Sequence, residues 1–229
     1  QSVVDTDSRG ELGLHYTSVP NILRVLDPLF LDDLRAQLRK AWHSEKRLRS
    51  FIGRLSRIRV FDPACGSGNF LVIAYRELRL LEIEALKRLR ELSGQQTQSL
   101  FSGVDLSSFY GIELADFAAE TAKLSLWVAE YQSNKRVEAT FGKTIPDLPL
   151  RHGGNIRAGN ALRLDWRDVC PTADNPETET YVVGNPPYLG HRYRADEQRE
   201  DMRVVFEGRI SSWGDLDYVT CWFVKGADF

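Results

Sequence analysis

The sequence predicts an α/β fold in which a parallel sheet is flanked by helices. Short apolar runs of strand character alternate with long stretches whose apolar residues recur at helical spacing, the pattern of strands joined by crossover helices. The chain of 229 residues is 42% apolar and 27% charged, which suits a globular protein with a buried core. The expected strands cover residues 57–62, 109–114, 155–158 and 180–184, and the expected crossover helices cover residues 69–92 and 115–131.

Residues 1–56 are expected to form an N-terminal helical segment that precedes the main domain, residues 57–229. Ser18 is a suitable N-cap, and Pro20 is tolerated in the first helical turn. This first helix should end near Pro28, because the residue before a proline disfavours the helical conformation. A second helix is expected from about residue 31 to residue 48.

Local patterns also predict a turn, two later helices and the buried face of one helix. Residues 57–62 alternate apolar and charged side chains, as a strand does, and Pro63–Gly68 are turn residues. Two further helices are expected at residues 196–207 and 216–227. In the helix at residues 115–131, the expected inner face consists of Phe117, Ala118, Thr121, Leu124, Trp127, Val128 and Tyr131.

Composition excludes several classes of protein. The longest wholly apolar run is Phe70–Tyr75, which is too short to span a bilayer, and the polar N-terminus does not resemble a signal sequence. Three widely spaced cysteines indicate a reducing compartment, hence a cytoplasmic location, rather than a disulfide framework or a zinc site. Net charge is −2, but residues 35–59 hold nine basic side chains and one acidic one. A solvated helix face explains that segment better than a phosphate-binding surface does.

The motif DPACGSGN, residues 62–69, connects an expected strand to an expected helix. Gly66 and Gly68 allow a ligand to approach the backbone, and the helix start offers free N–H groups and the positive end of the helix dipole. Residue 71 is leucine, so the third glycine of G-x-G-x-x-G is missing, and no P-loop lysine follows. The motif therefore favours a small ligand with a carboxylate or amino group; the alternative is a plain strand–turn–helix connection.

Polar residues also follow the other expected strands. Glu113 can accept both hydroxyls of a ribose, and Asn160 can bond to a nucleobase edge, although each alone is better explained as part of an exposed loop or turn. In Asn185-Pro186-Pro187-Tyr188, two prolines remove two N–H donors and leave oxygen acceptors for an exocyclic amino group. Tyr188 can stack on a planar base. Such a run is also typical of a rigid exit from a strand.

DPACGSGNFL followed by NPPY resembles the S-adenosylmethionine-dependent amino-methyltransferases, specifically the DNA adenine-N6 group with the gamma-type order of motifs. HYT, residues 15–17, resembles the N-terminal cofactor motif of that group. FYGIELADFAAETAKLSLWVAE and DLDYVTCWFVKGADF are similar to the large bacterial enzymes of type IIG/IIL restriction–modification and phage defence, which fuse methyltransferase and specificity regions. The resemblance covers roughly residues 10–229 and implies a Rossmann-like class I methyltransferase fold.

The resemblance implies S-adenosylmethionine as the cofactor and no metal. Asn185 and the Pro186 carbonyl would accept hydrogen bonds from the N6 amino group of an adenine flipped out of DNA, on which Tyr188 would stack. Many family members have aspartate where this chain has Asn160, so a charge is missing from that cofactor contact. The implied cofactor residues are Tyr16, Thr17, Asp62, Ala64, Gly66, Gly68, Phe70, Glu113, Asn160 and Ala161, and the implied catalytic residues are Asn185, Pro186, Pro187 and Tyr188.

Alternative functions remain open at this level. Protein-glutamine and ribosomal-RNA methyltransferases also use an Asn-Pro-Pro-aromatic loop, and a cofactor-binding fragment without activity is a further alternative. In the family, the sheet continues with more strands and a target-recognition domain. We therefore expect a fragment with the first four strands, whose parent enzyme binds double-stranded DNA, and we expect the strand at residues 180–184 to form an open edge.

Overall fold

The computed structural model describes residues 17–94, 103–142 and 153–229, and the predicted cofactor residue Tyr16 lies outside them. Four parallel strands form one sheet in the order β3-β2-β1-β4. The α/β fold with a parallel sheet is therefore confirmed, and β4 lies at an edge of the sheet as expected. The strands are β1 (Ile58–Asp62), β2 (Phe109–Glu113), β3 (Asn155–Ala158) and β4 (Glu179–Val182).

The register of the strands brings their carboxyl ends together. Asp62, the last residue of β1, pairs with Gly111 of β2, and Glu113 pairs with Ala158 of β3. On the other side of β1, Phe61 pairs with Val182 at the end of β4. Because parallel strands all end at the same edge, the loops that follow the four strands meet there, as in other open α/β sheets that bind ligands.

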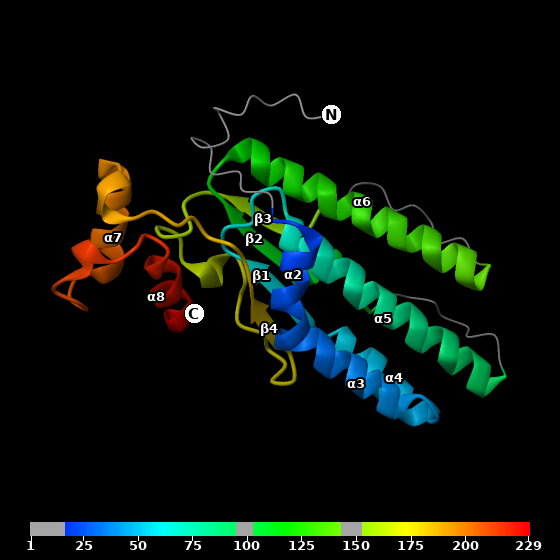
Figure 1. Ribbon diagram of the computed structural model, residues 1–229. Coiled ribbons are helices and arrows are strands. Elements are labelled where there is room, and N and C mark those ends of the chain that lie inside the picture. Colours follow the sequence, from blue (N-terminus) through cyan, green and yellow to red (C-terminus); the bar gives the residue numbers. More distant parts are fainter. Residues whose placement is uncertain (1–16, 95–102, 143–152) are drawn as a thin grey trace.

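Within the described residues, five helices cover one face of the sheet. Figure 1 shows α5 and α6 running side by side, with α3 and α4 against α5. The large core on this face includes Val60, Phe109 and Ile156 of the strands. The helices are α2 (Val19–Leu26), α3 (Asp32–Ala41), α4 (Glu45–Leu55), α5 (Asn69–Ser93) and α6 (Asp116–Phe141).

The single helix predicted for residues 31–48 is wrong. The structure has two helices there, because α3 ends at Ala41 and α4 begins at Glu45. Ser44 has an extended backbone between them, and its side chain accepts a hydrogen bond from the backbone N–H of Arg47, so it caps a new helix. The continuous apolar periodicity concealed this N-cap. The predicted break at Pro28 is also wrong: α2 ends at Leu26, but Asp27 keeps helical backbone angles and a π-helical turn, Asp27–Leu31, continues directly into α3.

The predicted inner face of α6 is also wrong except for Ala118, and the helix continues to Phe141. Phe117 is 85% exposed and Leu124 is 57% exposed. Small residues permit close approach: a Cβ added at Gly68 in the loop before α5 would lie 3.1 Å from the Cβ of Ala122. Large side chains at these positions would hold α6 away from the loop and from α5. The buried residues are Ala118, Ala119, Ala122, Leu126, Ala129, Ser133, Val137 and Phe141.

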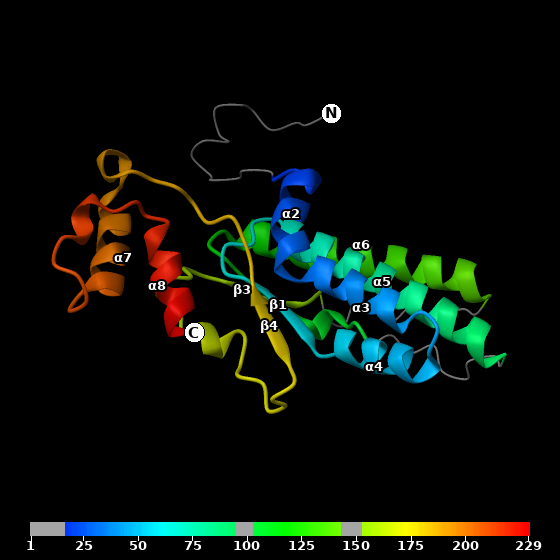
Figure 2. The ribbon, with the colours of Figure 1, turned by 60° about the horizontal axis from the view of Figure 1, so that its bottom comes forward.

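The last two helices lie apart from the other five. Figure 2 shows α7 (Asp196–Phe206) and α8 (Thr220–Asp228) grouped beyond the end of the sheet. On the second face, Phe61 of β1 contacts the rings of Trp166 and Phe229. Helix α8 begins at Thr220, later than the predicted residue 216. Within the described residues, no helix combines the length and the apolar character needed to cross a membrane.

The basic segment at residues 35–59 mainly ties elements together. The Arg54 guanidinium donates two hydrogen bonds, of 2.7 and 2.8 Å, to the Glu179 carboxylate on β4 and a third to Asp33 on α3. Arg35 bonds in the same way to Asp27 and to Glu77 of α5. These two arginines are therefore tied to other elements and do not form part of the solvated helix face that the sequence predicted. Among the described residues, no carboxylate forms an ion pair with Arg39, Lys40 or Lys46.

Arg54→Lys should destabilise the protein by about 1–2 kcal/mol, because an ammonium group cannot reproduce the paired hydrogen bonds to Glu179. Arg49→Lys is the matched control: Arg49 is 60% exposed and reaches Glu45 only at 3.8 Å. That exposed pair should contribute almost nothing. Urea denaturation of both variants measures the difference, and equal stability losses would contradict the bridging role of Arg54.

Candidate functional site

The loop between β1 and α5 forms the floor of the site. Gly66 and Gly68 have φ values of 53° and 85°, in the left-handed region that favours glycine. Gly68 is the N-cap of α5 and packs against Ala122, as described above. A Cβ added at Gly66 would meet no atom within 4 Å. The loop therefore has its back against α6 and an open side at Gly66, beside the N-terminus of α5.

Two carboxylates lie beside this loop. Asp62 is 1% exposed, and its Oδ1 accepts a hydrogen bond of 3.0 Å from the backbone N–H of Ala64. Glu113, at the end of β2, accepts from the N–H of Gly66 at 2.8 Å and from the N–H of Ala115 at 3.1 Å. An ionised carboxylate has about four acceptor positions, so Glu113 retains capacity for further donors.

Burial changes the acidity of Asp62. Desolvation raises the pKa of its carboxyl from 3.8 to about 7, the Ala64 hydrogen bond opposes this shift, and the negative charge of Glu113 adds to it. Among the described residues, no cationic side chain pairs with Asp62. The site therefore holds a buried acid for which a cationic ligand would be a favourable partner.

The cysteines play a structural part. Cys65, Cys170 and Cys221 are free and buried, and burial raises the pKa of each thiol. Cys65 lies in the glycine loop, where its backbone N–H donates to the carbonyl of Ile112 at 3.0 Å. Neutral thiols are weak nucleophiles, so these residues do not suit covalent catalysis.

The residues after β4 return to the same corner of the sheet. The N–H of Val183 donates to the carbonyl of Phe61 at 2.8 Å, which extends the β1–β4 pairing. A Cβ added at Gly184 would lie 2.4 Å from Oδ1 of Asp62. Only glycine fits this position, and its closeness brings the start of the Asn-Pro-Pro-Tyr segment against Asp62.

Asn185 and Thr17, predicted from opposite ends of the chain, are neighbours. Nδ2 of Asn185 donates a hydrogen bond of 3.3 Å to Oγ1 of Thr17. In the described part of the chain, no donor is bonded to Oδ1 of Asn185, whose side chain is exposed. The amide oxygen is therefore available to accept a hydrogen bond from a ligand.

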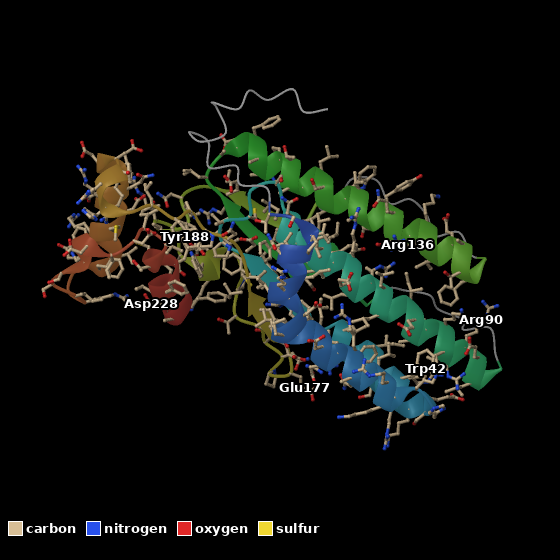
Figure 3. The ribbon with its side chains drawn as sticks, viewed as in Figure 1. Trp42, Arg90, Arg136, Glu177, Tyr188 and Asp228 are labelled. Atoms are coloured by element: carbon tan, nitrogen blue, oxygen red, sulfur yellow. The ribbon has the colours of Figure 1, made fainter. Side chains whose placement is uncertain are left out.

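Tyr188 is 71% exposed. Figure 3 shows it near the ends of the strands, whereas Glu177 lies at the opposite end of β4. No aromatic ring in the described ranges stacks on Tyr188. Pro187 is exposed and Pro186 is partly so, which leaves the segment accessible to a ligand.

The remaining predicted residues are less open. Nδ2 of Asn160 donates to Asp201 at 2.8 Å, and its Oδ1 accepts from the N–H of Leu162 at 2.9 Å. Ala161 is buried, with its carbonyl bonded to the indole N–H of Trp166. Phe70 belongs to the large core. For Phe70 the structure thus shows a packing role.

Sequence reasoning missed several residues that hold the site together. The sequence marks Gly184 only as the end of a strand and Asp201 only as part of an expected helix. Asp217 and Trp222 lie in the stretch DLDYVTCWF, whose only signal in the sequence is its resemblance to other enzymes. Trp222 donates a hydrogen bond of 3.2 Å to the carbonyl of Pro63 in the glycine loop. For Asp217 and Trp222 the resemblance of that stretch is a signal. The contacts of all four residues depend on the tertiary fold.

Known proteins share this architecture and sequence. The family model described as MmeI, DNA-methyltransferase domain, matches residues 38–229. DNA methyltransferase A of Bacillus subtilis (strain 168) is 46% identical over 100% of this chain and 26% of its own length. A putative type II restriction enzyme and methyltransferase of Methanocaldococcus jannaschii is 36% identical over 60% of this chain and 11% of its own length.

A solved structure agrees with these matches. The type IIL restriction–modification enzyme MmeI, determined in complex with DNA, superposes with a TM-score of 0.88 and is 39% identical. The match covers 100% of this chain and 30% of that chain. The described chain therefore spans less than a third of the relatives it matches over its full length.

Asp62→Asn should stabilise the ligand-free protein at neutral pH and above. Between the ordinary carboxyl pKa of 3.8 and the folded pKa of about 7, the folded state holds a proton that the unfolded state has lost, so stability falls as pH rises through that range. Asparagine keeps an acceptor for Ala64 and carries no charge. The gain should be about 1–3 kcal/mol at about pH 8 and absent below about pH 4.

Urea denaturation of both proteins across this pH range measures the effect. The wild type should lose stability relative to Asp62→Asn as pH rises from about 4 to about 7, and the difference should then stay constant. Parallel stability curves for the two proteins would show that the Asp62 carboxyl ionises normally in the fold.

Proposed function

This chain belongs to the family of MmeI DNA-methyltransferase domains, and we propose that its site transfers a methyl group from S-adenosylmethionine to the N6 amino group of an adenine in DNA. One observation carries the assignment of an exocyclic amino group on a planar base as the acceptor. The segment Asn185-Pro186-Pro187-Tyr188 leaves β4 directly beside Asp62, with the oxygen of Asn185 available and Tyr188 exposed. This places acceptors for an amino group and a surface for a planar base next to the glycine loop.

The acidic corner suits S-adenosylmethionine. Its methionine part carries an ammonium group, which is the cation that the buried Asp62 carboxylate lacks among the described side chains. The open side of Gly66 leaves room for the backbone of the methionine part, and the N-terminus of α5 favours its carboxylate. Glu113 has acceptor positions left for the two ribose hydroxyls. When bound, the cofactor supplies an electrophilic methyl group.

Asn185 and Pro186 act on the amine that receives the methyl group. Oδ1 of Asn185 and the Pro186 carbonyl accept hydrogen bonds from the two N–H groups of this amine, which orients the nitrogen lone pair away from the ring and toward the cofactor side. The same oxygens stabilise the positive charge that develops on nitrogen as the nitrogen–methyl bond forms and the methyl–sulfur bond breaks, and the amine then loses one proton to solvent. In the structure the amide nitrogen of Asn185 is bonded to Thr17, which leaves its oxygen for the substrate amine. Positioning and oriented dipoles account for the catalysis, without a covalent enzyme intermediate.

Tyr188 receives the flipped base. Adenine N6 is hydrogen-bonded inside duplex DNA, so the base must leave the stack before it can be methylated. An exposed aromatic ring next to the acceptors compensates for lost base stacking, by about 1–3 kcal/mol. The MmeI structure contains DNA, and we assign target recognition, as part of restriction–modification or phage defence, to regions outside residues 1–229.

Asn185→Ala should abolish methyl transfer by the full-length protein while leaving S-adenosylmethionine binding within about threefold, because the amide contacts the substrate amine and only its Thr17 bond reaches the cofactor side. Transfer of tritiated methyl groups to DNA measures activity, and calorimetry measures the cofactor affinity. Turnover at more than about a hundredth of the wild-type rate would refute the role of Asn185.

Tyr188→Ala should raise the KM for DNA and lower kcat by about tenfold or more, whereas Tyr188→Phe should retain most of the activity because the ring that stacks on the base is preserved. The same transfer assay compares both variants. If the phenylalanine and alanine variants lose activity equally, the hydroxyl and not the ring is what matters, and the stacking role fails.

A further inference from the structure

The carboxylate of Asp201 in α7 is a buried hub for which the proposed chemistry gives no role. Asp201 is 3% exposed and accepts hydrogen bonds from three side chains. Nδ2 of Asn160 and the hydroxyl of Tyr218 each donate to Oδ2 at 2.8 Å, and Nε of Arg163 donates to Oδ1 at 2.6 Å. A buried charge is costly unless it is well bonded, and here both oxygens are engaged.

One arm of this hub reaches the loop after β3. Asn160 is a predicted cofactor residue, and its donation to Asp201 fixes the orientation of its amide. The amide oxygen, Oδ1, accepts a hydrogen bond from the N–H of Leu162. The Asn160 side chain therefore links the turn after β3 to Asp201. Asp201 therefore determines where Asn160 lies relative to the cofactor side of the sheet.

The other arm reaches the Asn-Pro-Pro-Tyr segment. The backbone N–H of Tyr218 donates to the carbonyl of Leu189 at 3.1 Å, and Oδ1 of Asp217 accepts from the N–H of Leu189 at 3.0 Å. Leu189 directly follows Tyr188, so Asp217 and Tyr218 clamp the end of the proposed catalytic segment. A continuous chain of hydrogen bonds thus runs from Asn160 through Asp201 and Tyr218 to Leu189.

Helix α8 adds a third anchor to the same structure. The ring of Trp222 packs edge-on against the ring of Tyr218, with centroids 5.4 Å apart, and its indole N–H bonds to Pro63 in the glycine loop. The α7–α8 unit consequently contacts the loops that follow β1, β3 and β4. A shift of this unit would move these loops relative to one another.

We propose that Asp201 is a positioning residue for the methyl transfer: through Asn160 and Tyr218 it fixes the cofactor loop and the Asn-Pro-Pro-Tyr segment in register. The proposal rests on the proposed function. Misplacement of reacting groups by about 1 Å lowers rates by up to about 100-fold, so a rigid connection between the two loops favours turnover. Asp201 itself contacts neither substrate nor cofactor and acts through its two neighbours.

Tyr218→Phe cuts this connection at one atom. The Tyr218 ring is 6% exposed and packed, so phenylalanine keeps the packing and removes only the hydroxyl that bonds to Asp201. Tyr181→Phe is the matched control, because the Tyr181 hydroxyl donates to another carboxylate, Glu179, at 2.6 Å on β4. Both variants lose one tyrosine–carboxylate hydrogen bond. Only the bond of Tyr218 belongs to the chain of hydrogen bonds that joins Asn160 to Leu189.

The test uses the full-length protein and two measurements. In Tyr218→Phe, kcat for methyl transfer to DNA should fall by about tenfold, with KM for S-adenosylmethionine nearly unchanged, whereas Tyr181→Phe should stay within about twofold of wild type. Amide hydrogen exchange at Leu189 should become about tenfold faster in Tyr218→Phe and remain unchanged in Tyr181→Phe.

Each of the two measurements has an outcome that overturns the proposal. Equal kcat values in the two variants would remove the positioning role, and unchanged Leu189 exchange in Tyr218→Phe would remove the mechanical link. Failure of the unmodified protein to methylate DNA would instead contradict the proposed function. The exchange measurement requires no turnover, so it would still decide whether Tyr218 holds the segment in place.

Discussion

The site depends on the close contact between Gly184 and the carboxylate of Asp62. It exists because β1 pairs in parallel with β4, so that the residues following both strands emerge at the same corner of the sheet. No side chain fits between residue 184 and Oδ1 of Asp62. The contact joins an acidic cofactor corner to a segment rich in oxygen acceptors, and it helps to keep Asp62 away from water. The raised pKa of Asp62 follows from that burial.

Two groups of helices stabilise this corner from different sides. On one face, the alanine-rich side of α6 lets Gly68 come close, which holds the glycine loop against the sheet. Beyond the strand ends, α7 and α8 bind the loops through Asp201 and Trp222. Arg54 connects the N-terminal helices to the start of β4, at the end of that strand opposite the site. The basic residues of this segment therefore contribute mostly to assembly of the fold.

Much of the fold could be predicted from the sequence, because strand periodicity and glycine turns are local signals. The sequence motifs also named Asp62, Glu113 and Asn185, and the structure brings these close to the glycine loop or to Thr17. The buried face of α6 could not be predicted, since hydrophobicity favours Phe117 inside while close packing requires alanine there. The Asp201 hub was equally hidden, because its partners are separated by long stretches of chain and meet only in the tertiary structure.

The central claim is that an adenine amino group receives the methyl group at this corner. The most direct measurement is nucleoside mass spectrometry of DNA incubated with the full-length protein and S-adenosylmethionine carrying a labelled methyl group. The account predicts labelled N6-methyladenine as the product, because an acceptor pair beside an aromatic ring suits an exocyclic amine. Label in N4-methylcytosine or 5-methylcytosine, or in protein or RNA but not in DNA, would contradict it.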